Sequence, residues 1–145
     1  MKLDEIFDLW SKDSEINPMD ISTESLKIPK LHHKYYSLLS KEKLVLRKLE
    51  SEYAQLYQIK FEYFLGTLDE ETLKERNWRP NPRTIIKSDI PMNIESDKDI
   101  IDITLRIAYQ KEKISALESI VKSVMERNWI IRNFIEWQKF QNGVS

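Results

Sequence analysis

Residues 31–66 read LHHKYYSLLSKEKLVLRKLESEYAQLYQIKFEYFLG. Apolar side chains recur in this stretch at alternating steps of three and four residues, the spacing that lines them up along one side of an α-helix. The series consists of Leu31, Tyr35, Leu38, Val45, Leu49, Leu56, Ile59 and Tyr63, with Glu42 and Glu52 as interruptions. A neighbouring apolar row widens the stripe, so one partner helix is not enough to cover it.

The ends of this helix are marked by two residues with special backbone preferences. Pro29 has a fixed φ that suits the first turn of a helix, so we expect the helix to begin near it, although Ser22 or Ser25 could start it earlier. Gly66 directly follows Leu65 and favours a helix end there. The sequence therefore predicts a long basic helix over about residues 29–65.

A second apolar series of the same kind lies nearer the carboxyl end. It follows the segment Ser96–Asp99, whose serine and acids are typical of a helix start, and predicts a long helix over about residues 97–141. The series consists of Ile100, Ile103, Ile107, Ile114, Leu117, Val121, Val124, Ile131 and Ile135. Gln110 and Asn128 occupy two positions of its register. Either they are buried in the seam and specify its register, or they lie at its wet edge.

The remaining segments are shorter. Leu3, Ile6, Phe7 and Trp10 share one face of a short helix expected over about residues 3–12. Residues 67–95 contain three prolines and no sustained period, so we expect an irregular connector, within which a short helix at 70–76 and an extended piece around 84–87 can form. The composition, with 2 Gly and 5 Pro, favours long helices over sheets. We expect a single all-α domain, residues 1–145, with coiled-coil-like packing in a homo-oligomer.

The sequence offers no support for a catalytic, metal or cofactor site. It contains no cysteine, and its two histidines, His32 and His33, are adjacent and so point about 100° apart on a helix, which prevents them from holding one metal ion. It has no glycine-rich loop, nucleophile elbow or Walker lysine. The acidic amino terminus is unlike a signal peptide, and no apolar run reaches the ~20 residues of a membrane span. We therefore expect a soluble, non-secreted protein that is not an enzyme, has no cofactor and does not associate with membranes.

Charge is unevenly distributed along the chain, although the net charge is only -1. Residues 1–24 carry two lysines against seven acids, whereas residues 27–60 carry eight lysines and arginines against three acids. Cations interspersed with aromatic rings suit single-stranded nucleic acid, because the cations bind phosphates and the rings can stack on unpaired bases. The candidate phosphate-binding residues are Lys34, Lys41, Lys43, Arg47, Lys48 and Lys60. The alternative is a solvated helix face whose lysines pair with glutamates and whose tyrosines belong to the core.

Two further segments suggest intermolecular contacts. Residues 76–83 place three arginines around Trp78 and two prolines, either as a loop that grips a strand or, as we favour, as an arm that packs Trp78 onto a neighbouring subunit. The carboxyl-terminal part of the second long helix is apolar around most of its circumference, which in water demands burial against other chains. The candidate oligomerisation residues are Val124, Trp129, Ile131, Phe134 and Ile135.

The order of these features resembles the UvsY family of bacteriophage recombination mediators over most of the chain. The matching pieces are Lys2-Leu3-Asp4-Glu5, Leu31 with Lys34-Tyr35, Tyr63-Phe64-Leu65-Gly66, Ser96-Asp97-Lys98-Asp99, and Arg127 ahead of the apolar tail. Residues 31–66 match without a gap.

The resemblance implies a homo-oligomeric ring in the cytoplasm of an infected bacterial host. Such a ring would bind single-stranded DNA and help a RecA-like recombinase replace the single-strand-binding protein, without catalysis of its own. In the family a Lys-x-Arg pair before the aromatic pair contributes to DNA binding, and Gln58 and Lys60 stand at its two positions here, so Lys60 is the better candidate. The competing hypothesis is a helical scaffold or assembly protein that does not bind nucleic acid.

Overall fold

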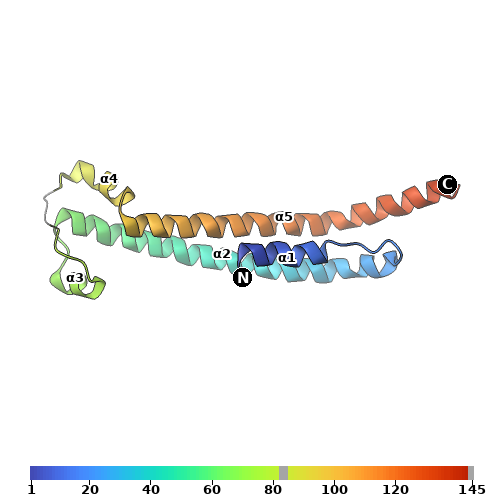
Figure 1. Ribbon diagram of the computed structural model, residues 1–145, viewed down its shortest axis with the longest axis horizontal. Coiled ribbons are helices and arrows are strands. Elements are labelled where there is room, and N and C mark those ends of the chain that lie inside the picture. Colours follow the sequence, from blue (N-terminus) through green and yellow to red (C-terminus); the bar gives the residue numbers. More distant parts are fainter. Residues whose placement is uncertain (82–84, 144–145) are drawn as a thin grey trace. The chain divides into compact units, whose positions relative to one another are not determined.

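A computed structural model describes residues 1–81 and 85–143, and within these residues the chain forms helices and no strand (Figure 1). The all-α prediction is confirmed. The elements are α1 (Leu3–Asp13), α2 (Ile21–Leu65), α3 (Glu70–Arg76), the 3-10 turn η1 (Lys87–Asp89), α4 (Ile90–Glu95) and α5 (Lys98–Gln141).

Helix α2 begins at Ile21, whereas Pro29 lies inside it. The Oδ1 of Asp20 accepts hydrogen bonds from the amide of Thr23 and the hydroxyl of Ser22, both at 3.4 Å. These bonds cap the first turn, where backbone amides lack partners within the helix. The expected start near Pro29 is therefore wrong, and the earlier start near Ser22, which the sequence also allowed, is the one that the structure has, because the Asp20 cap lets the helix begin there.

The chain divides into two compact units, each built from parts of α2 and α5. The first unit comprises Met1–Leu44 with Gln110–Ser145, and the second comprises Val45–Tyr109. Because both long helices run through both units, the expectation of one domain stays a prediction.

The first unit packs α1, the first part of α2 and the last part of α5 around a common core. In α1 the side chain of Ile6 is buried, and the ring of Trp10 meets that of Tyr35 edge-on at 5.4 Å between centroids. The other buried apolar residues of this unit are Leu39, Ile114, Leu117, Ile120, Val121, Val124 and Ile131. Most of the α5 residues among them belong to the apolar series that predicted the helix.

Polar residues interrupt both apolar series of the first unit, and two of the interruptions meet. The Nε2 of Gln110, which is buried, donates hydrogen bonds to the carbonyl oxygen of Glu42 at 2.8 Å and to its carboxylate at 2.5 Å. The Nζ of Lys113 lies 3.0 Å from the same carboxylate. Of the two interpretations of Gln110, burial in the seam is correct. Asn128, in contrast, is exposed, and its neighbour Arg127 is buried in its place.

The second unit has a core that the sequence did not predict, because part of it comes from the connector. Helix α4 buries Ile90 and Ile94, four residues apart on one face, against Ile100 at the start of α5. Half-buried aromatic and aliphatic residues pack on this cluster: Tyr53, Leu56, Tyr57, Phe61, Phe64 and Ile85. Tyr57, like the buried Tyr35 of the first unit, therefore belongs to the core as the alternative interpretation of the basic helix proposed, whereas Tyr36 is exposed.

The connector is mostly helical. Helix α3 lies where a short helix was expected, with Asp69 capping its start by accepting from the amide of Thr72 at 3.3 Å. Gly66 ends α2 with a φ of 83°, in the left-handed region that glycine tolerates best. The expected extended piece around residues 84–87 begins outside the described residues, and at its other end Lys87 belongs to η1.

Candidate nucleic-acid interface

The first unit carries three of the predicted phosphate-binding residues, all exposed on α2. The Nζ of Lys34 lies 2.6 Å from Asp13, and that of Lys43 lies 3.7 Å from Glu118. Lys41 makes no ion pair with any residue that the structure describes. Since Lys34 and Lys41 are seven residues apart, they share one side of the helix. Lys41 is thus the freest of these charges.

Asp13 remains a charged partner for Lys34. Burial tends to raise the pKa of Asp13, but hydrogen bonds from Lys34 and Tyr35 outweigh that effect and hold its pKa below the usual 3.8. The hydroxyl of Tyr35 donates to the same carboxylate oxygen at 2.8 Å. A phosphate approaching Lys34 would therefore compete with an ionised carboxylate.

The second unit carries Arg47 and Lys48, both exposed on α2. Across residues 1–81 and 85–143, neither makes an ion pair. Being adjacent, they point about 100° apart and offer positive charge over a broad arc of the helix. Their exposure and lack of acidic partners suit contact with a polyanion.

Lys60 has very different surroundings. Its side chain is buried, and its Nζ lies 3.2 Å from Asp97, 2.9 Å from Asp99 and 3.9 Å from the centroid of the Trp78 ring. Asp97 also caps α5, since its other carboxylate oxygen accepts from the amides of Asp99 at 3.0 Å and Ile100 at 3.4 Å. Lys60 thus links α2 to the start of α5, while Gln58, at the other position of the family pair, is exposed.

The segment around Trp78 is attached to its own chain. The Trp78 ring meets that of Tyr63 at 5.4 Å between centroids, and the Tyr63 hydroxyl donates to the carbonyl of Arg79 at 2.6 Å. Arg76 and Arg79 are exposed, whereas Arg83 lies outside the described residues. Trp78 therefore packs within the second unit, a placement that neither sequence interpretation included.

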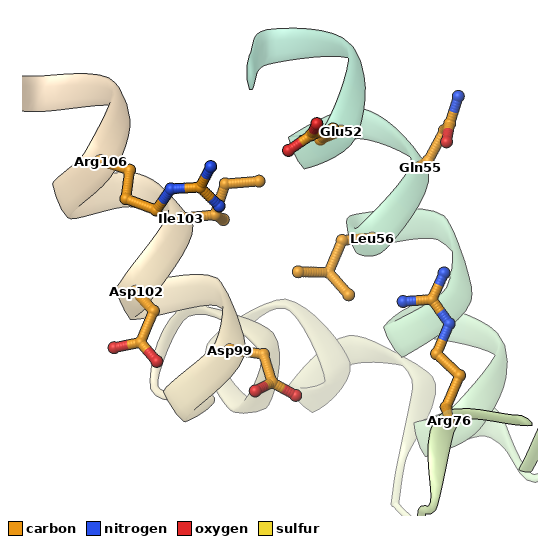
Figure 2. Close-up of a pocket in the computed structure, with 8 residues that line it drawn as sticks. All are labelled: Glu52, Gln55, Leu56, Arg76, Asp99, Asp102, Ile103 and Arg106. Atoms are coloured by element: carbon orange, nitrogen blue, oxygen red, sulfur yellow. The ribbon is translucent and has the colours of Figure 1, made fainter. Parts of the chain in front are cut away.

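The second unit also contains a pocket of about 340 Å³ that the sequence did not predict (Figure 2). Leu56 of α2 and Ile103 of α5 give it apolar surface, and Arg76 of α3 and Arg106 of α5 give it positive charge. Figure 2 shows the Arg106 guanidinium directed toward α2, where Glu52 lies. The lining residues with charge or amide groups are Glu52, Gln55, Arg76, Asp99, Asp102 and Arg106. Three carboxylates against two guanidinium groups make a poor phosphate site.

The predicted oligomerisation residues fall into two groups. Val124 and Ile131 are buried within the first unit itself. Trp129 and Ile135 are exposed, and Phe134 is half-buried. Exposed apolar residues adjoining them on α5 are Ile130, Trp137 and Phe140. The surface available to another chain is therefore the second group with these neighbours.

Within the described residues, no group of acidic and histidine side chains is arranged to hold a metal ion. The same part of the chain contains no helix with the length and apolar content of a membrane span.

Comparisons with known proteins give one family and one fold. The family model described as "Recombination, repair and ssDNA binding protein UvsY" matches residues 9–144. No curated protein matches the chain. A crystal structure of the bacteriophage T4 recombination mediator protein UvsY (lattice type II) has a TM-score of 0.85 at 16% identity, covering 98% of each chain. A second crystal form (lattice type IV) has a TM-score of 0.84 at 15% identity, covering 97% of this chain and 99% of that one.

Proposed function

This chain belongs to the UvsY family of recombination, repair and single-stranded-DNA-binding proteins, and on that basis we propose that it is itself a recombination mediator. It binds single-stranded DNA and promotes the loading of a RecA-like recombinase onto DNA that a single-strand-binding protein covers. The observation that carries this proposal is the family match over residues 9–144, which includes residues of both units. The family resemblance predicted from the sequence is confirmed by that match.

In this proposal the DNA phosphates are bound mainly by Lys41, Arg47 and Lys48. These three cations are exposed and face no acidic partner in the described structure, so binding DNA breaks no existing ion pair. Lys34 and Lys43 can add contacts, because exposed ion pairs are worth little and exchange readily. The contact predicted for Lys60 stays a prediction, and it would require release from Asp97 and Asp99.

The proposal includes self-association of the protein, with a ring as the expected form. A few phosphate contacts on one near-neutral chain bind weakly, whereas linked copies act at high effective concentration and raise avidity by ~10²–10⁴. Trp129, Phe134 and Ile135 are the residues of the original prediction that can contribute to such contacts, since they are not fully buried in the chain. The protein acts without catalysis, in the cytoplasm of an infected bacterium.

A scaffold protein that never binds nucleic acid is the second candidate. The observation that favours it is that three of the six predicted phosphate-binding residues already form ion pairs with acids. These residues are Lys34, Lys43 and Lys60. The two candidates differ in their behaviour toward an unstructured oligonucleotide.

The test is binding of a fluorescent oligothymidylate by the purified protein at several salt concentrations, followed by a loading assay. A mediator binds tightly at low salt, loses affinity steeply as salt rises, and shortens the delay before a RecA-like recombinase assembles on DNA covered by single-strand-binding protein. Binding that is absent even at low salt contradicts the mediator and leaves the scaffold. Salt-dependent binding with an unchanged delay would keep DNA binding but contradict loading.

A further inference from the structure

We propose that the pocket of the second unit holds one unpaired nucleobase of the bound DNA strand, with guanine preferred over the other bases. This inference rests on the single-stranded-DNA binding in the proposed function, and it assigns a base to a site that suits phosphate poorly. We call this site the base pocket. It is formed by residues of α2, α3 and α5, all within the second unit.

The base pocket has an apolar floor between the two long helices. Leu56 of α2 and Ile103 of α5 form this floor, and Ile103 is buried. Figure 2 shows Leu56 directed from α2 toward α5. The volume of about 340 Å³ is within the range of ~300–1,000 Å³ typical of clefts that bury a small ligand. Bases that leave the stack are held against apolar side chains in this way.

The charges around the base pocket nearly cancel. Asp99 already shares its charge with Lys60, whose Nζ lies 2.9 Å from the Asp99 carboxylate. The other two carboxylates, those of Glu52 and Asp102, balance the two arginines that line the pocket. An uncharged ligand is therefore favoured over a phosphate, which the carboxylates would repel.

The charged groups of the base pocket are available to a ligand. Among the residues that the structure describes, Glu52, Asp102 and Arg106 make no ion pair. Figure 2 shows the Arg106 guanidinium directed toward α2, where Glu52 lies, and no ion pair closes the space between the two side chains. The pocket thus offers carboxylate acceptors and guanidinium donors at the same time.

Guanine matches this arrangement best among the four bases. Its N1–H and N2 amino group are adjacent donors that suit the two oxygens of one carboxylate. Its O6 and N7 are adjacent acceptors that suit the fork of a guanidinium group. Thymine has no amino group, and cytosine and adenine have no such pair of adjacent acceptors. We assign the donor edge of guanine to Glu52 and the acceptor edge to Arg106.

The DNA strand can reach the base pocket from a phosphate bound at Lys48. Lys48, Glu52 and Gln55 are spaced i, i+4 and i+7, so they share one side of α2. Lys48 is exposed and lies about one helical turn, ~6 Å, from Glu52 along the helix axis. One nucleotide spans such a separation between its phosphate and its base. The phosphate contact of the proposed function and the base pocket therefore lie on one path along α2.

The test is competition between oligonucleotides for the full-length protein. A fluorescent oligothymidylate is displaced by unlabelled strands of equal length in which isolated thymines are replaced by guanine or by hypoxanthine. Hypoxanthine is guanine without the N2 amino group, so it changes only the edge assigned to Glu52. Equal length keeps the number of phosphates constant, and isolated guanines do not form quadruplexes.

We expect the wild type to bind the guanine strand about tenfold more tightly than the oligothymidylate, because a good bidentate contact discriminates between bases by this factor or more. The hypoxanthine strand should show a smaller preference. Glu52→Gln and Arg106→Gln should each lose most of the guanine preference. The matched controls, Glu50→Gln and Lys111→Gln, change the same charges at exposed positions outside the pocket and should keep it.

The measured quantity is the ratio of two affinities for the same variant, so a general loss of DNA binding does not imitate the expected result. Circular dichroism checks that each variant keeps its helix content. The base pocket is overturned if the wild type binds the guanine and hypoxanthine strands equally, or if E52Q and R106Q keep the guanine preference. Both of these outcomes leave the mediator standing. Wild type that binds no strand at low salt contradicts the proposed function and the base pocket together.

Discussion

The guanidinium of Arg127 lies 2.8 Å from the carboxylate of Glu24, and both side chains are only 4% exposed. The same guanidinium donates hydrogen bonds to the carbonyls of Asp13, Ser14 and Glu15, at 3.2, 3.4 and 2.9 Å. These carbonyls belong to the last residue of α1 and the two residues after it, where a helix presents partial negative charge and unpaired acceptors. One residue of α5 therefore joins the end of α1 to the first turn of α2.

Arg127→Met should strongly destabilise the protein, because it leaves the Glu24 carboxylate buried with its main partner missing. Breaking a buried pair in this way costs about 3–5 kcal/mol of unfolding free energy. Urea denaturation at a fixed protein concentration measures this change in the free energy of unfolding. Lys27→Ala is the matched control, since Lys27 also pairs with Glu24 but is largely exposed, and we expect a change below about 1 kcal/mol. Equal effects of the two variants would refute the special role of Arg127.

Acidification should reduce stability below about pH 4.5. A hydrogen bond from Lys27, together with one from Arg127, holds the pKa of Glu24 below its usual 4.5 despite burial. Burial also tends to raise the pKa of Glu42, but hydrogen bonds from Gln110 and Lys113 hold that pKa below 4.5 as well. A lowered pKa in the folded state gives stability that is complete above the unfolded-state value and is lost as the pH falls through the folded-state value.

Urea midpoints measured from pH 7 to pH 3 test this pH dependence. Glu24→Gln and Glu42→Gln should each be less stable at pH 7 and should show a flatter decline on acidification. A wild-type stability that is constant down to pH 3 would exclude the predicted linkage.

The polar contact among Glu42, Gln110 and Lys113 should be sensitive to single changes and tolerant of a combined one. Lys113→Met leaves a carboxylate in a nearly dry position and should cost about 3 kcal/mol. The triple variant Glu42→Leu, Gln110→Leu and Lys113→Met removes the buried charge. It should recover most of the stability that Lys113→Met alone loses. Urea denaturation of the two variants compares them directly, and a triple variant that is less stable than K113M would contradict this account.

Lys60→Met should lower the free energy of unfolding. Asp97 and Asp99 would lose the cation that they share, and the Trp78 ring would lose its contact with the Lys60 ammonium. The pair is largely desolvated at Lys60, and we expect a loss of about 2–4 kcal/mol in urea denaturation. Gln58→Ala, two residues away and exposed, should change stability little. Unchanged stability of K60M would show that Lys60 is free for another partner.

The triple variant K41A/R47A/K48A should lose affinity for single-stranded DNA without losing stability. Each phosphate contact contributes ~0.7 to the slope of log affinity against log salt, so removing three should reduce the slope by about 2 per chain. Titrations of an oligothymidylate at several salt concentrations measure the slope. Lys12, Lys98 and Lys111 are also exposed, and their triple alanine variant is the control for net charge. Identical slopes for the two triple variants would point away from α2 as the DNA-binding helix.

The sequence predicted what depends on local periodicity and missed what depends on distant partners. The apolar series of α5 predicts a helix, and most of its members are buried. Burial of Arg127 could not be predicted from that series, because its partners at Asp13 and Glu24 lie more than a hundred residues away. The surroundings of Lys60 have the same origin, since Asp97 and Asp99 come from the start of another helix. Helix α4 is six residues long, too short for a period to show.

The two carboxylate oxygens of Asp97 have different partners. One lies against the Nζ of Lys60, and the other accepts hydrogen bonds from the amides of Asp99 and Ile100. If Lys60 moves away, the carboxylate is free to rotate and these amides lose a fixed acceptor. Hydrogen exchange at the two amides should then accelerate. The hydrogen-exchange rate of these two amides therefore reports whether the Lys60 ammonium lies against Asp97, and measuring it requires no change to the Lys60 side chain.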